Sequence, residues 1–320
     1  MKKTLIALAV LAASGASFAQ VTITGTYAAG YQAETNVTKN SVVGDYSGLG
    51  VDTSYVAFSA SEDLGGGLKA SAVMALDGFT RGTATGGDSN LTLSGNFGSL
   101  SLDNGKGSDY LSGDYVGMDE KVFGAKTTSD SITYKTPSFG GLTVAFAHGE
   151  SDNAAQVGLG VGAAGPAAGQ RNNTLTVSYA AGPLSATAGI RSYDQTGLGG
   201  AAASSTNNPS KSLVRAKATY DLGVAKIGGG VVQLNMNQGT RTDTLIGAIV
   251  PFGNLTFTAD VANRKFADSF TDGTTNGYGL GAAYALSKRT SVQVSYASWD
   301  GAIGAATRST KTAVLLGHSF

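Results

Sequence analysis

The sequence predicts an all-β fold, a 16-stranded antiparallel transmembrane β-barrel, from three observations. Segments of about ten residues recur in which apolar and polar side chains alternate, as in membrane-spanning strands. The connections between them alternate between short turns and long polar loops. The last segment, residues 310–320, has strand character up to its final residue. Because a sheet edge inside a bilayer leaves N–H and C=O groups without partners, this strand must pair with the first, residues 21–27.

The first 19 residues have the pattern of a secretory signal peptide. Lys2 and Lys3 form a basic start, residues 5–13 form a short apolar run, and residues 17–19 form a small-x-small cleavage site. The apolar run is too short to span about 30 Å of hydrocarbon. We therefore expect residues 1–19 to be cleaved and residues 20–320 to form a single barrel domain.

The composition excludes several classes of protein. No apolar run reaches the ~18 to 20 residues of a transmembrane helix. Cysteine is absent, which excludes disulfides and thiolate metal sites. Charged residues make up 14% of the chain, below the ~25% of ordinary soluble domains. Without Lys2 and Lys3, 20 of the 22 basic residues remain against 22 acidic ones, a net charge of −2. This balance argues against a nucleic-acid partner.

Sixteen strands can be placed on the chain, with seven short turns between them. Their even number puts both termini on the side of the short turns. The alternation of residues separates two faces; for example, Val21, Ile23 and Tyr27 lie opposite the intervening threonines. In a bilayer the apolar face meets lipid, and the small or polar face lines a lumen too wide for side chains to fill. The predicted strands are residues 20–33, 53–63, 68–79, 91–96, 99–103, 130–136, 142–150, 172–181, 184–194, 211–221, 224–235, 242–250, 254–266, 276–286, 289–300 and 310–320.

Several stretches carry a family resemblance over the full length. They are residues 1–9, 62–69, 97–102, 137–141 and 284–290, together with the terminal Phe320. In their order and spacing they resemble the trimeric general porins of Gram-negative outer membranes, of the neisserial or betaproteobacterial type. The resemblance implies a homotrimer with short periplasmic turns, long outer loops and a third loop folded into the lumen.

The same resemblance implies a function and partners. The channel would allow passive diffusion of small hydrophilic solutes and ions, surrounded by outer-membrane lipid and lipopolysaccharide. Phe320 resembles the terminal residue that the barrel-assembly machinery recognises, although it also suits a lipid-facing aromatic girdle. Small side chains that we expect to point outward, Gly25, Ala29 and Ala313, are consistent with a close trimer interface, and equally with small residues tolerated anywhere in a wall.

Two groups of charged residues are candidates for the narrowest part of the pore. By resemblance, residues 104–129 correspond to the constriction loop; the alternative is an external loop with solvated charges. Charge is most effective where a pore is narrowest, because the low-dielectric wall focuses the field. The acidic candidates are Asp103, Asp109, Asp114, Asp119 and Glu120.

The basic candidates lie within predicted strands. Charge on the lipid face costs ~2 to 4 kcal/mol near the midplane, so these bases should face the lumen, although a wet base can still lie away from the narrowest section. Alternation places seven bases inward: Lys69, Lys135, Arg191, Arg215, Lys217, Lys226 and Arg264. We select Lys135, Arg191, Arg215, Lys217 and Arg264 as pore-lining candidates.

The sequence departs from the resembled family at three positions. Tyr55, Asn104 and Thr133 occupy places where relatives often carry pore arginines. We therefore predict weak selectivity, or selectivity for neutral solutes. Two other classes stay open: a substrate-selective channel for a sugar or organic acid, and a structural or adhesive surface barrel with a closed lumen.

Catalysis has little support in the sequence. His148 and His318 are far apart and lie on predicted outward faces. No metal-binding spacing, nucleophile elbow or phosphate-binding loop is present. We expect neither an enzyme nor a cofactor.

Overall fold

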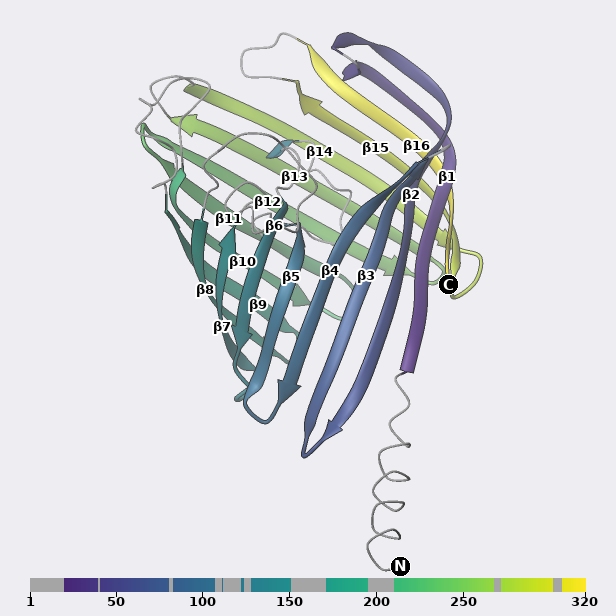
Figure 1. The fold of residues 1–320 in the computed structure, drawn as a ribbon. Helices are drawn as coiled ribbons and strands as arrows, with labels where there is room; N and C mark the ends of the chain where they lie inside the picture. The colour runs from purple at the N-terminus through teal and green to yellow at the C-terminus, as the bar shows by residue number, and fades with distance from the viewer. Residues whose placement is uncertain are drawn as a thin grey trace, which may run out of the picture.

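A computed structural model describes residues 20–320 except 40, 81–82, 107–110, 112–121, 124–127, 151–170, 195–209, 268–271 and 302–306. The predicted signal peptide lies outside this part of the chain. Sixteen strands form one closed antiparallel barrel, in which each strand pairs with its sequence neighbours and β1 pairs with β16 (Figure 1). The predicted fold is confirmed. Among the described residues, no helix has the length and hydropathy needed to cross a membrane.

The strands have the following bounds: β1 Gln20–Lys39, β2 Val42–Gly65, β3 Leu68–Thr80, β4 Thr83–Gly95, β5 Gly98–Lys106, β6 Thr128–Lys135, β7 Leu142–Glu150, β8 Arg171–Ala181, β9 Leu184–Asp194, β10 Ser210–Asp221, β11 Lys226–Met236, β12 Thr240–Phe252, β13 Leu255–Ala267, β14 Asp272–Ala285, β15 Thr290–Asp300 and β16 Arg308–Ser319. All sixteen predicted strands are present. Several extend further than predicted, because hydrogen-bonded pairing continues past the apolar alternation into polar residues.

The first hairpin shows the largest extension. Of residues 34–52, expected to be a polar connection, residues 34–39 and 42–52 continue as strand, and β1 pairs with β2 as far as Lys39 opposite Val42. Register shifts interrupt this pairing at Ala28/Ala29 and between Glu34 and Val37. The sequence does not mark these paired residues by alternation, because a ladder outside the hydrocarbon has no lipid-facing side that must be apolar.

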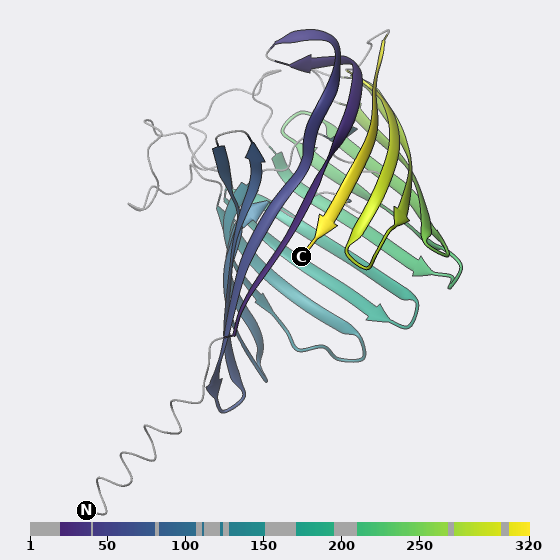
Figure 2. The same ribbon diagram turned by 90° about the vertical axis from the view of Figure 1, so that its right-hand side faces the viewer.

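The seam between β1 and β16 closes the barrel, with β1 in purple beside β16 in yellow (Figure 2). Ala29 lies opposite Leu316, and the backbone groups of Gly25 and Phe320 exchange two hydrogen bonds of 3.0 Å. The two ends therefore pair as predicted, but in a different register. Val21 lies opposite Ala60 of β2 instead of facing β16, since the tilt of strands in a barrel staggers neighbouring ends.

The two faces of the wall separate as the alternation predicts. Val21, Ile23 and Tyr27 are 65%, 54% and 50% exposed on the outside. Ala313 is a correction to the predicted outward set. It is 2% exposed, whereas its neighbour Val314 is 46% exposed, so Ala313 lies on the inner face. The prediction relied on the small size of Ala313. Its place in the alternation puts it on the other face of the strand from Val314.

Candidate functional site

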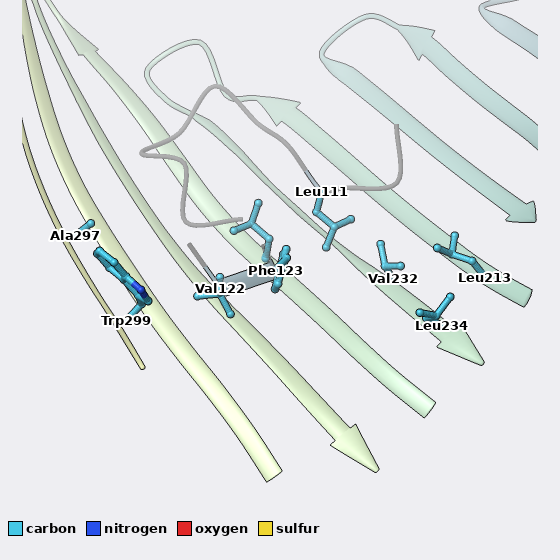
Figure 3. Packing of buried hydrophobic residues seen from close by; sticks show 10 residues of the cluster. Leu111, Val122, Phe123, Leu213, Val232, Leu234, Ala297 and Trp299 are labelled. Carbon is cyan, nitrogen blue, oxygen red and sulfur yellow. The ribbon is translucent and has the colours of Figure 1, made fainter. Parts of the chain in front are cut away.

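A cluster of apolar side chains, most of them large, lies on the inner face of β10 to β13 and β15, where the sequence predicts small or polar residues. Leu111, Val122 and Phe123, from the segment between β5 and β6, pack against it and are 4%, 7% and 4% exposed (Figure 3). The wall side of the cluster consists of Leu213, Val232, Leu234, Leu245, Ala262, Ala297 and Trp299. These contacts cover apolar area that would otherwise face water inside the pore.

We call Leu111, Val122 and Phe123 the docked residues. They belong to the predicted constriction loop, and they lie against strands far from β5 and β6 in the barrel order. Part of this segment therefore reaches across the lumen. The four acidic candidates Asp109, Asp114, Asp119 and Glu120 lie outside the described residues.

A glycine on β11 makes room for Leu111. A Cβ atom on Gly230 would lie 2.7 Å from Leu111 Cδ2 and 2.6 Å from the Ala216 carbonyl oxygen. Both distances are shorter than ordinary contacts of a Cβ atom. The contact with the Ala216 carbonyl oxygen cannot be relieved by a change of rotamer, so the neighbouring strand requires glycine here, and the space left free accommodates the Leu111 side chain.

The predicted pore-lining base Arg264 lies beneath the docked residues. Its Nε and Nη2 donate to the two carboxylate oxygens of Asp243 at 2.7 and 2.8 Å, and its guanidinium carbon lies 5.3 Å from the Phe123 ring centre. Arg264 and Asp243 are 9% and 3% exposed. Arg241 Nε approaches the same carboxylate at 3.3 Å. Paired charge and aromatic stacking thus hold Phe123 against the wall.

Two other basic candidates line a cavity of about 420 Å³ in the lumen wall. Arg191 Nε donates to Thr174 Oγ1 at 2.8 Å, and Arg215 Nη2 donates to Thr176 Oγ1 at 3.4 Å. At the other side of the cavity, the Asp103 carboxylate accepts a hydrogen bond from the Thr133 side chain. The structure thus brings together one acidic and two basic candidates from β5, β9 and β10.

The remaining basic candidates lie beside this cavity. Lys135 pairs with Ala145, which lines the cavity, and is exposed. Lys217 follows Arg215 on the same face of β10 and is also exposed. Both keep their predicted inward place in the alternation.

The positions that depart from the family pattern differ in orientation. Thr133 lines the cavity, and Tyr55 shares the inner face with the buried Ala57. Asn104 also borders the cavity, but it shares the alternation of the exposed Leu102, and its side-chain amide donates to Asp130 on the neighbouring strand. The side chain of an arginine at position 104 would therefore point away from the lumen. Its absence from this chain thus carries less weight for ion selectivity than the absence of arginine at positions 55 and 133.

Both histidines lie near strand ends in local hydrogen bonds. His148 Nδ1 lies 2.9 Å from Asn173 Oδ1, and His318 Nδ1 lies 2.9 Å from Thr290 Oγ1. The described residues contain no group of three or more histidine, cysteine or acidic side chains placed to hold a metal ion.

The docked residues lead to a prediction about conductance. Replacing Phe123 with alanine should release the segment from the wall, because truncating a buried phenylalanine to alanine typically costs about 3 to 5 kcal/mol. Single-channel recording in planar bilayers should show larger or noisier current steps. Phe139→Ala is a matched control, since Phe139 is 87% exposed beside a turn. Wild-type conductance and noise in Phe123→Ala would contradict a role in narrowing the pore.

Comparisons with known proteins agree with this geometry. The family described as "Gram-negative porin" matches residues 4–301. The outer membrane porin protein 32 of Delftia acidovorans is 31% identical, over 91% of this chain and 88% of that protein. The major outer membrane protein P.IB of Neisseria meningitidis serogroup B is 29% identical, over 93% of each.

Solved structures share the fold. The anion-selective porin from Comamonas acidovorans superposes with a TM-score of 0.70 at 22% identity, covering 95% of this chain and all of that one. The outer membrane channel DcaP of Acinetobacter baumannii has a TM-score of 0.69 at 11% identity, covering 94% and 97%. With a closed 16-stranded barrel and a family match over almost its whole length, the chain belongs to the Gram-negative porins and forms a channel in the outer membrane.

Proposed function

We propose that the chain is a general diffusion pore of weak ion selectivity, narrowed by the segment that carries the docked residues. The supporting observation is that the inner wall carries both signs of charge on different strands. Around the cavity, acidic side chains lie on β3 to β5 and basic ones on β6 to β10. The acidic side chains are Asp77, Asp88 and Asp103, and the basic ones are Lys135, Arg191, Arg215 and Lys217.

One structural relative, from Comamonas acidovorans, is an anion-selective porin. In this chain Tyr55 and Thr133 are neutral at inward positions where relatives often carry arginines. The bases that remain share the lumen with carboxylates, and at ~0.1 M salt each charge acts over about 10 Å. Anions and cations therefore each meet attractive wall charges, which favours weak selectivity.

Selectivity can be measured by the reversal potential under a potassium chloride gradient in a planar bilayer. The wild-type potential should lie near zero. Arg191→Gln with Arg215→Gln should shift the permeability ratio toward cations by roughly fivefold, since one unit charge ~4 Å from an ion is worth about 1 kcal/mol in water. Arg308→Gln is the control, because Arg308 lies outside the lumen beside Tyr278 and Asp300.

Either of two results would contradict the proposal: strong chloride preference in the wild type, or an unchanged potential in the double variant. Liposome swelling with neutral sugars of increasing size separates the alternatives. A general pore admits them by size alone. A substrate-selective channel shows saturable uptake of one class, and a closed structural or adhesive barrel admits none.

We also infer a homotrimer that is exported with cleavage after Ala19 and assembled through its terminal Phe320. The small outward residue Ala29 allows close approach of a second copy. Gly25 is covered by the Phe320 ring, and the Phe320 side chain remains 48% exposed at the seam. Semi-native electrophoresis of the outer-membrane protein tests the trimer, and its N-terminal sequencing tests the cleavage. Assembly of a chain that ends at Ser319 tests the role of Phe320. No catalytic role is assigned to any residue, since the family consists of channels.

A further inference from the structure

The cavity between β5 and β10 has opposite charges at its two ends. We propose that it is a binding site for short zwitterionic solutes of peptide-like chemistry, with the carboxylate bound by Arg191 and Arg215 and the ammonium bound by Asp88 and Asp103. This inference rests on the proposed function, because the cavity is reached only through an open lumen. The strands that form it are neighbours in the wall (Figure 1).

The two charged ends are held over a defined span. Asp103 is bonded to Thr133 on β6, and Arg191 is bonded to Thr174 on β8. Thr133, Ala147 and Thr174 are direct partners across three successive strands. Two strand spacings correspond to about 10 Å. The distance between the Asp103 carboxylate and the Arg191 guanidinium therefore corresponds to the length of a short peptide.

The arginine end is preorganised. Besides its bond to Thr174, Arg191 lies with its guanidinium carbon 5.9 Å from the Tyr193 ring centre. Arg215 extends across β9, where a Cβ on Gly189 would come within 3.2 Å of its Nε. Gly189 thus lets Arg215 reach Thr176 on β8. Guanidinium groups held this way bind carboxylates through charge-assisted hydrogen bonds, with little ordering cost on binding.

The floor of the cavity consists of small side chains. Ala145, Ala147 and Gly149 of β7 lie between the two charged ends, and all three line the cavity. A larger residue on β7 would fill the space across which the ends face each other. The volume of about 420 Å³ lies within the range of small-molecule sites.

The charges of the lining select the class of solute. Among the described residues that line the cavity, two arginines and two aspartates sum to a net formal charge of zero, with opposite charges at the two ends. A dicarboxylate would place one carboxylate against Asp103, and a diamine would place one ammonium against the arginines. A zwitterion of matching length satisfies both ends. Three residues of extended chain span about 10 Å, so triglycine fits this distance whereas glycine does not.

The wild-type channel provides the first test, by block of potassium chloride current in a planar bilayer. Triglycine should block at a concentration roughly tenfold lower than N-acetyl-triglycine or triglycinamide, because each cap removes one charge-assisted contact. Glycine should block no better than the capped peptides. Equal block by all four compounds, in a channel that conducts normally, would overturn the inference and leave the proposed function standing. A chain that does not conduct would instead contradict the proposed function.

Matched variants test which side chains bind the carboxylate and which bind the ammonium of the solute. Arg215→Gln should weaken triglycine block by roughly fivefold to tenfold. Lys217→Gln removes the same charge from the same face of β10, outside the cavity lining, and should change ion selectivity without changing the block. Asp103→Asn should abolish the preference for triglycine over its N-acetyl form, whereas Asp77→Asn should retain it. Equal effects within either pair would show that overall lumen charge, and no local site, causes the block.

Discussion

Replacing Gly30 with valine is expected to prevent closure of the barrel. A Cβ at position 30 would lie 2.0 Å from the Val314 carbonyl oxygen and 2.9 Å from Leu315 Cα, both in the backbone of β16. No change of rotamer relieves contact with a backbone, so β1 and β16 would have to separate. The cost should exceed the ~1 to 3 kcal/mol typical of overpacking. An opened seam would also expose unpaired peptide groups to lipid.

Closure can be measured by the heat-modifiable mobility of the refolded protein in gel electrophoresis and by pore formation in liposomes. Gly50→Val is a matched control, because Gly50 lies directly opposite Gly30 on β2 and a Cβ there would have no atom within 4 Å. Gly50→Val should refold like the wild type. A Gly30→Val barrel with wild-type yield and conductance would show that the seam lies elsewhere.

Replacing Arg264 with methionine is expected to destabilise the folded barrel by about 3 to 5 kcal/mol, the usual cost of breaking a buried ion pair from one side. Asp243 would lose both hydrogen bonds from Arg264 and, among the described residues, keep only the 3.3 Å approach of Arg241. The carboxylate is 3% exposed, so water cannot replace the lost partner. Phe123 would also lose the guanidinium against its ring.

Urea unfolding in lipid vesicles measures this loss. Arg308→Met is the control: its 2.6 Å pair with Asp300 is partly exposed, with side chains 42% and 22% accessible. Surface pairs of this kind contribute ~0 to 1 kcal/mol. Arg264→Met combined with Asp243→Leu should recover most of the stability, because neither member of the buried pair is left without the other and Arg241 is partly exposed. If Arg264→Met and Arg308→Met were equally stable, Arg264 would not anchor the segment.

Much of the barrel could be predicted from local patterns, and particular residues show where this ends. Val21, Ile23 and Tyr27 alternate with threonines because one side of the strand contacts lipid, so they predicted both the strand and its faces. Residues 34–39 and 42–52 carry no such pattern, although most of them pair with a neighbouring strand. Ala313 was assigned to the wrong face because its size was weighed above its place in the alternation.

The candidate site could be predicted only in part. Arg191, Arg215 and Asp103 were identified because a mid-strand charge is costly in lipid. That they line one cavity depends on the register of β5 to β10. Asp243, the partner of Arg264, escaped the prediction. A signal was present, since Leu213, Val232 and Leu234 are large apolar residues on strand faces otherwise expected to be small or polar, and they mark the surface that the docked residues cover.

The sequence by itself determined the number of strands, the pairing of the chain's two ends, and which face of each strand meets lipid. These follow from the requirement that a bilayer imposes on every residue: backbone groups must be paired and the outer side chains must be apolar. Only the tertiary structure decided the register of the seam, the burial of Arg264 with Asp243, and the grouping of Asp103 with Arg191 and Arg215. These depend on the stagger of tilted strands and on contacts across the lumen, between residues far apart in the chain.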